Sequence, residues 1–74
     1  MRAIVVYNHT TREAGRENRN FDVLPMIGDV IMPKNRKILV VDFAGSGPKV
    51  TYRTWHSDGT LEIHVETGYA GYRD

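Results

Sequence analysis

Two histidines and two glutamates fall close together near the end of this sequence, in the run HSDGTLEIHVE at residues 56–66. Imidazole and carboxylate groups are the side chains that most often move protons near neutral pH. Their ability to act together depends on the local structure that positions them. The alternating runs KVTYRTWH and LEIHVET flank Ser57-Asp58-Gly59-Thr60. This pattern predicts a β-hairpin with Asp58-Gly59 as a two-residue turn.

That turn would determine how the two strands pair. It places His56 opposite Leu61 and Arg53 opposite His64, and side chains alternate across a strand, so we expect the two histidines on opposite faces. We therefore predict neither a metal site nor an acid–base pair here. The apolar face of the hairpin is predicted to comprise Val50, Tyr52, Thr54, Leu61, Ile63 and Val65. The charged face is predicted to comprise Thr51, Arg53, Trp55, Glu62, His64 and Glu66.

The rest of the chain offers few groups for catalysis. There is no cysteine, and Ser46 and Ser57 lie in predicted turns, where serine commonly makes local hydrogen bonds. The loop GSGPK at residues 45–49 lacks the spacing of a phosphate-binding loop and precedes a predicted strand rather than a helix. A chain of this length has little room for a water-excluding pocket. We therefore expect a protein that is not an enzyme and that needs no cofactor.

Trp55 is the strongest candidate for a contact residue. A tryptophan on a charged hairpin face is costly to leave in water, and tryptophan is enriched at the energetic centres of protein interfaces. The alternative is that another segment of the same chain covers it. The predicted partner-binding residues are Trp55, Arg53, His64, Tyr69 and Tyr72, the last two from the C-terminal GYAGYRD.

The basic residues indicate a second hypothesis, a nucleic-acid or nucleotide site. They fall into two groups: Arg12, Arg16 and Arg19 in a polar segment, and Lys34, Arg36 and Lys37 in a turn. Such residues can contact phosphates while aromatic rings stack on bases. However, the net charge is only +1, whereas nucleic-acid-binding domains are usually strongly basic. A solvated basic surface is therefore favoured.

Length and composition limit the architecture. The 74 residues are predicted to form one domain, 1–74, which is marginal as a monomer. With no cysteine to form disulfides, we expect support from homo-oligomerisation or from a protein partner. No signal peptide and no apolar run long enough to span a membrane are recognisable, so we expect a cytoplasmic protein without membrane contact.

Strand-like runs occur at residues 2–8, 21–26, 30–32 and 38–44, besides the hairpin. The first is apolar on both sides and is expected inside a sheet. In the run at 38–44, Asp42 is expected to mark the wet face together with Ile38, leaving Leu39, Val41 and Phe43 for the core. Residues 9–20 have almost no apolar side chains and are predicted to form a long polar loop.

The stretch LPMIGDVIMPKNRKILVVDF resembles the entry to a small SH3-like barrel, a fold shared by ribosome-associated modules, transcription-factor modules, ribonuclease toxins and small phage proteins. The resemblance implies an all-β SH3-like barrel, or else a strongly bent antiparallel sheet, of five to six short strands. No site residue follows from it. Our leading hypothesis is a non-enzymatic binding module, an inhibitor or adaptor of the phage-encoded or accessory bacterial kind. Nucleic-acid binding is the alternative, and a ribonuclease is a distant third.

Overall fold

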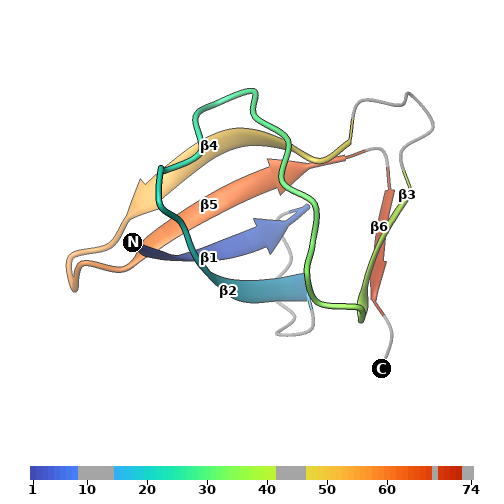
Figure 1. The fold of residues 1–74 in the computed structure, drawn as a ribbon, viewed down its shortest axis with the longest axis horizontal. Helices are drawn as coiled ribbons and strands as arrows, with labels where there is room; N and C mark the ends of the chain where they lie inside the picture. The colour runs from blue at the N-terminus through green and yellow to red at the C-terminus, as the bar shows by residue number, and fades with distance from the viewer. Residues whose placement is uncertain (9–14, 42–46, 68, 73–74) are drawn as a thin grey trace.

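The computed structural model describes residues 1–8, 15–41, 47–67 and 69–72. The strands are β1 (Arg2–Tyr7), β2 (Arg16–Asn20), β3 (Ile38–Val41), β4 (Lys49–Trp55), β5 (Leu61–Glu66) and β6 (Tyr69–Tyr72). Four of them form one sheet in the order β2-β1-β5-β4, and β3 pairs with β6 at one end of it (Figure 1). The described part of the chain contains no α-helix, so the all-β prediction is confirmed.

The sheet is not closed into a barrel, because β2 and β4 lie at its two edges. It is also not a purely antiparallel sheet, since β1 runs parallel to β5 while the β1–β2 and β4–β5 pairs are antiparallel. The sequence motif that resembles an SH3-like entry therefore lies in an open mixed sheet. The difference arises because hairpin-sized patterns report neighbouring strands and carry no information about how distant strands close.

The apolar strand β1 lies inside the sheet, as its sequence predicts. Ala3, Val5 and Tyr7 are buried on one face, and Val6 is buried on the other. Val5 is paired with Ile63 of β5 and with Glu17 of β2. A strand with neighbours on both edges and apolar residues on both faces is typical of a sheet interior.

Strand β2 corrects the prediction of a polar loop at residues 9–20. Residues 16–20, RENRN, form a strand with no apolar side chain at all. Glu17 and Arg19 point to the core side, where their polar groups are satisfied within the protein. Residues 9–14 lie outside the described part of the chain. Sequence reasoning missed this strand because it assumed that an inward-facing side chain must be apolar.

The hairpin loop is one residue longer than predicted. The His56 amide donates to the Thr60 carbonyl at 2.8 Å, and the Gly59 amide donates to the His56 carbonyl at 3.0 Å, so Ser57, Asp58 and Gly59 form a three-residue loop. Gly59 has φ of +90°. This combination of a tight turn and a left-handed residue is the second most common hairpin connection.

The longer loop shifts the pairing of β4 and β5 by one residue. Trp55 pairs with Leu61, and Arg53 pairs with Ile63, so both lie on the core side of the sheet. Tyr52 and Thr54, which we predicted on the apolar face, point to the opposite side. An irregularity between Val50 and Tyr52 absorbs the shift and returns Val50 to the core opposite Val65. We call the side opposite the core the outer face.

Residues 21–33, which we call the strap, cross the core side between β2 and β3 (Figure 1). The predicted strand at 30–32 is reduced to a single bridge between Val30 and Lys49. Backbone hydrogen bonds from Gly28 to Val50, from Val50 to Asp29 and from Ile31 to Pro48 attach the strap to the start of β4. The strap packs Phe21, Leu24 and Ile31 against the core.

The core also contains Ile38, which we predicted on the wet face of its strand. It is completed by Ala3, Val5, Tyr7, Val50, Leu61, Ile63 and Val65. The side chains of Leu39 and Val41, like Asp42 and Phe43, lie outside what the structure describes. Ile38 is the first residue of β3, and the strap that leads into it makes that position internal.

Glu17 is a buried carboxylate that joins three parts of the fold. One oxygen accepts hydrogen bonds from the Tyr7 hydroxyl at 2.9 Å and from Arg19 at 3.1 Å. The other accepts from the backbone amides of Lys34 and Asn35 at 3.2 and 3.0 Å. Burial, and then the neighbouring charge of Glu17, raise the pKa of the Tyr7 hydroxyl far above its usual range. The phenol therefore stays a donor.

Replacing Glu17 with Gln is expected to lower the free energy of unfolding by about 2–4 kcal/mol, since it leaves the buried Arg19 contact without its charge and replaces acceptor lone pairs with an NH₂ group. Urea unfolding followed by circular dichroism measures this. Glu66→Gln, at the exposed end of β5, is the control and should change stability by less than about 0.5 kcal/mol. Equal effects of the two substitutions would show that Glu17 has no special role.

Gly59→Ala is expected to cost about 1 kcal/mol, because alanine is strained at positive φ. A Cβ at this position would meet no atom within 4 Å, so the cost is conformational and not steric. Ser57→Ala in the same loop is the matched control. Unchanged stability of Gly59→Ala in urea unfolding would argue against the three-residue loop.

Candidate functional site

His56 and His64 meet at Glu62 on the outer face. Nε2 of His56 lies 3.0 Å from Oε2 of Glu62, and Nε2 of His64 lies 3.8 Å from the same oxygen. Our prediction that these histidines lie on opposite faces of the hairpin is therefore wrong. The reason is the one-residue shift in the hairpin, which brings His56 to the same side as Thr60, Glu62 and His64.

Arg16 completes this group from the far edge of the sheet. Its guanidinium forms a salt bridge with Oε1 of Glu62. Arg16 belongs to β2 and Glu62 to β5, and β1 lies between them, so the contact crosses the outer face of β1. Val6 of β1 is Arg16's partner in the strand pairing and is buried. We call Arg16, His56, Glu62 and His64 the outer cluster.

The electrostatics of the outer cluster favour the carboxylate. The hydrogen bond from His56, followed by that from Arg16, lowers the pKa of Glu62, and these effects outweigh the opposing effect of burial. The Glu62 side chain is only 13% exposed. A carboxylate that is mostly removed from water but contacted by three basic side chains is held ionised and in one position.

Tyr52 packs on the outer cluster. Its ring is stacked on that of His64, with centroids 4.1 Å apart and planes inclined by 11°. Tyr52 and His64 are also directly paired across β4 and β5. The Tyr52 side chain keeps an exposed surface, so an aromatic ring stands beside the charged group on the outer face.

A different surface lies on the core side of the sheet, along the strap. Five of its aliphatic side chains are between 48% and 83% exposed: Val23, Met26, Ile27, Val30 and Met32. An open groove of about 760 Å³ follows the same segment, with Arg19 and Lys34 among its lining residues. Sequence reasoning missed this surface, because Pro25 and Gly28 interrupt the run and leave no alternation from which to assign a face.

The predicted partner-binding residues do not form one site. Trp55 is 57% exposed at the end of β4. Arg53 lies on the same side and donates to the Pro25 carbonyl of the strap at 3.5 Å. His64 points to the outer face, so the structure separates it from Trp55 and Arg53. The side chains of Tyr69 and Tyr72 lie outside what the structure describes, although their backbone forms β6.

The predicted nucleic-acid residues are also divided. Arg16 is bound to Glu62 on the outer face, while Arg19 points to the core side and bonds Glu17 and the Met32 carbonyl. Lys34, Arg36 and Lys37 are exposed in the turn before β3. Arg12 lies outside the described residues. The basic residues therefore do not form one continuous patch in the described structure.

Within the described residues, no group of three or more His, Asp or Glu side chains has a geometry suited to a metal ion. The same residues include no helix long and apolar enough to cross a membrane. Comparison of the chain with known protein families, with curated proteins and with solved structures finds no match. The two surfaces themselves are therefore the features that bear on function.

Stability should depend on pH through Glu62. Its folded pKa is depressed below the ordinary value of 4.5, so its ionised contacts stabilise the fold above that value and are lost as the pH falls through the folded pKa. We expect the stability difference between the native protein and Glu62→Gln to be largest near neutral pH and to shrink in acid. Urea unfolding of both proteins at a series of pH values measures it. A difference that stays constant down to about pH 3 would contradict the assignment.

Proposed function

We propose that the protein is a binding module that docks an apolar segment of a protein partner on the strap, acting as an inhibitor or adaptor. The observation that carries this proposal is the exposure of five large aliphatic side chains on thirteen consecutive residues, 21–33. Large exposed apolar side chains gathered on one short segment, three of them lining a groove, are typical of interaction sites. Trp55 extends the surface on the same side of the sheet.

The strap is held in place by hydrogen bonds and packing, and this favours a role as a recognition surface. The strap makes three backbone hydrogen bonds with residues 48–50. In addition, the Asp29 carboxylate closes a turn by accepting a hydrogen bond from the Met26 amide at 2.8 Å. Phe21 and Leu24 anchor the strap to the core from below. An apolar surface that is already ordered loses less conformational entropy on binding than a flexible one.

The charges around the strap favour an acidic partner. Lys34 lines the groove, and Arg36 and Lys37 are exposed in the adjoining turn, whereas Arg19 in the same lining is already paired with Glu17. Asp29 is the acidic residue of the groove lining. We therefore propose a partner segment with apolar anchors and flanking carboxylates, since complementary charge gives orientation and speeds encounter.

Nucleic-acid binding through Lys34, Arg36 and Lys37 is the second candidate, supported by their exposure in one turn. The apolar strap beside them has no role in phosphate contact, which favours the protein partner. Salt discriminates between the two, since several phosphate contacts would make affinity fall steeply with added salt. A second copy of the protein is a further candidate partner for the strap, and size-exclusion chromatography of the pure protein tests for self-association.

A display library of short apolar peptides with acidic, neutral or basic flanks tests the proposal. Selected peptides should carry acidic flanks, and Ile27→Asp should weaken their binding by at least tenfold, because it places a charge on an exposed aliphatic position in the middle of the strap. Binding is measured by fluorescence anisotropy of a labelled peptide. Trp55→Ala should also weaken binding while circular dichroism shows an intact fold.

The matched control is Asn18→Asp, which adds the same charge at an exposed position on the outer face. It should bind the selected peptides as the native protein does. Equal binding by Ile27→Asp and Asn18→Asp would remove the strap from the interface. Unfolding of Trp55→Ala would show that Trp55 is a core residue.

A further inference from the structure

We propose that the outer cluster is a proton-transfer site that cleaves RNA phosphodiesters by transesterification. The site lies on the opposite side of the sheet from the strap and is independent of the binding function proposed there. The residues assigned to it are Glu62, His56 and Arg16, with a base-binding hollow beside them. RNA is the inferred substrate, because a ribose 2′-hydroxyl supplies its own nucleophile and these side chains supply everything else that the step needs.

The outer cluster contains more basic groups than pairing requires. One salt bridge from Arg16 to Oε1 would neutralise Glu62. However, the Nε2 atoms of His56 and His64 also lie within 4 Å of Oε2. These contacts hold Glu62 ionised, but neutralising one carboxylate does not require three basic side chains. A carboxylate, an imidazole and a guanidinium brought together on one face of the sheet are also the elements of acid–base chemistry on an anionic substrate.

The exposures of these side chains match the roles. The Glu62 side chain is mostly shielded and ionised, whereas the His56 side chain is 46% exposed. His56 uses Nε2 for Glu62, so the proposal assigns its other ring nitrogen, Nδ1, to the substrate. Arg16 is fixed by the same carboxylate and carries the positive charge that a phosphorane requires. Arg16 and Glu62 lie on strands, and His56 follows β4 directly and is held by its backbone hydrogen bond to Thr60.

The step balances without a co-reactant. Glu62 accepts the proton of the ribose 2′-hydroxyl while the ribose 2′-oxygen forms a bond to phosphorus. The bond from phosphorus to the 5′-oxygen breaks, and protonated His56 donates a proton to that leaving oxygen. The products are a 2′,3′-cyclic phosphate and a 5′-hydroxyl. Solvent then takes the proton from Glu62 and returns one to Nδ1 of the exposed His56 ring, which restores both groups.

A hollow adjoins the outer cluster where β1 and β5 begin. It measures about 390 Å³, at the small end of the range for ligand sites, and its lining includes Arg2, Ile4, Asn18, Asp58 and Thr60. Ile4 is the strand-pairing partner of Glu62, and Thr60 precedes Glu62 by two residues on the same face, so the hollow and the reacting groups are neighbours.

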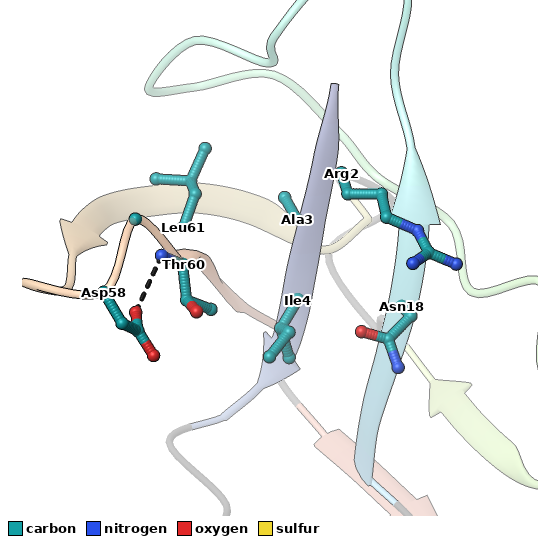
Figure 2. Close-up of a pocket in the computed structure, with 8 residues that line it drawn as sticks. Arg2, Ala3, Ile4, Asn18, Asp58, Thr60 and Leu61 are labelled. Atoms are coloured by element: carbon teal, nitrogen blue, oxygen red, sulfur yellow. Dashed lines mark hydrogen bonds between the residues drawn. The ribbon is translucent and has the colours of Figure 1, made fainter.

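Figure 2 shows the polar ends of this hollow. Asp58 and Thr60 of the hairpin loop lie on one side of Ile4, and the Asn18 side chain lies on the other. The Asp58 carboxylate accepts a hydrogen bond from the Thr60 amide at 2.9 Å, and this contact fixes the loop (Figure 2). An amide and a carboxylate around an aliphatic floor suit a single nucleobase, whose edge carries donors and acceptors and whose faces are apolar.

The test uses a short RNA oligonucleotide containing all four bases, with fluorophore and quencher at its ends, and the same sequence as DNA. The native protein should cut the RNA and leave the DNA intact, and mass spectrometry should find a 2′,3′-cyclic phosphate. Glu62→Gln and His56→Ala should each lower the rate by about 100-fold or more, the usual contribution of one acid or base.

Glu66→Gln, prepared in the same way, is the control for copurifying nucleases and should cut at the native rate. His56 is exposed, so His56→Ala keeps the test valid should Glu62→Gln unfold. Equal cleavage by the native protein and His56→Ala, cleavage of the DNA, or RNA binding without cleavage would each overturn the proposal. Each of these outcomes leaves the peptide-binding result for the strap unchanged.

Discussion

The buried carboxylate of Glu17 is the contact on which the rest of the structure depends. It comes from a strand without apolar residues and satisfies a hydroxyl, a guanidinium and two backbone amides from three separate segments. An unpaired carboxylate in this position would be strongly destabilising, whereas a fully satisfied one specifies a single arrangement. Glu17 thereby docks β2 on β1 and also holds the turn at residues 34–35.

This contact also determines how the strap is presented. Arg19, bonded to Glu17, donates to the Met32 carbonyl at 2.9 Å and so fixes the end of the strap. The attachment to residues 48–50 holds its middle. Val23, Met26 and Ile27, which precede these attachments along the chain, remain exposed. The exposed apolar surface is therefore a consequence of how the fold holds this segment.

The sheet separates two kinds of chemistry. Its core side carries the hydrophobic cluster and the strap, and its outer face carries the charged group around Glu62. One residue of strand register decides which side chains belong to each face, since a slip by one exchanges them all. The three-residue loop closed by His56 and Thr60 is therefore the local feature that creates the outer cluster.

The sequence by itself determined the all-β class, the apolar β1 inside a sheet and the existence of the β4–β5 hairpin. These depend on local periodicity and on turn residues, which act between near neighbours. The loop length could not be read in this way, since Asp58-Gly59 suits both a two-residue turn and the end of a three-residue loop. The register, and with it the positions of Tyr52, Trp55 and both histidines, followed from that choice.

Only the tertiary structure decided the rest. Residues 16–20 form a strand because Tyr7 and the turn at 34–35 satisfy Glu17, and these partners lie ten or more residues away in sequence. The parallel pairing of β1 with β5 brings Arg16 to Glu62, a contact between residues 46 positions apart. Such contacts leave no periodic trace in the sequence. The physical reason is that a polar residue's burial depends on its partners, and the fold alone chooses those partners.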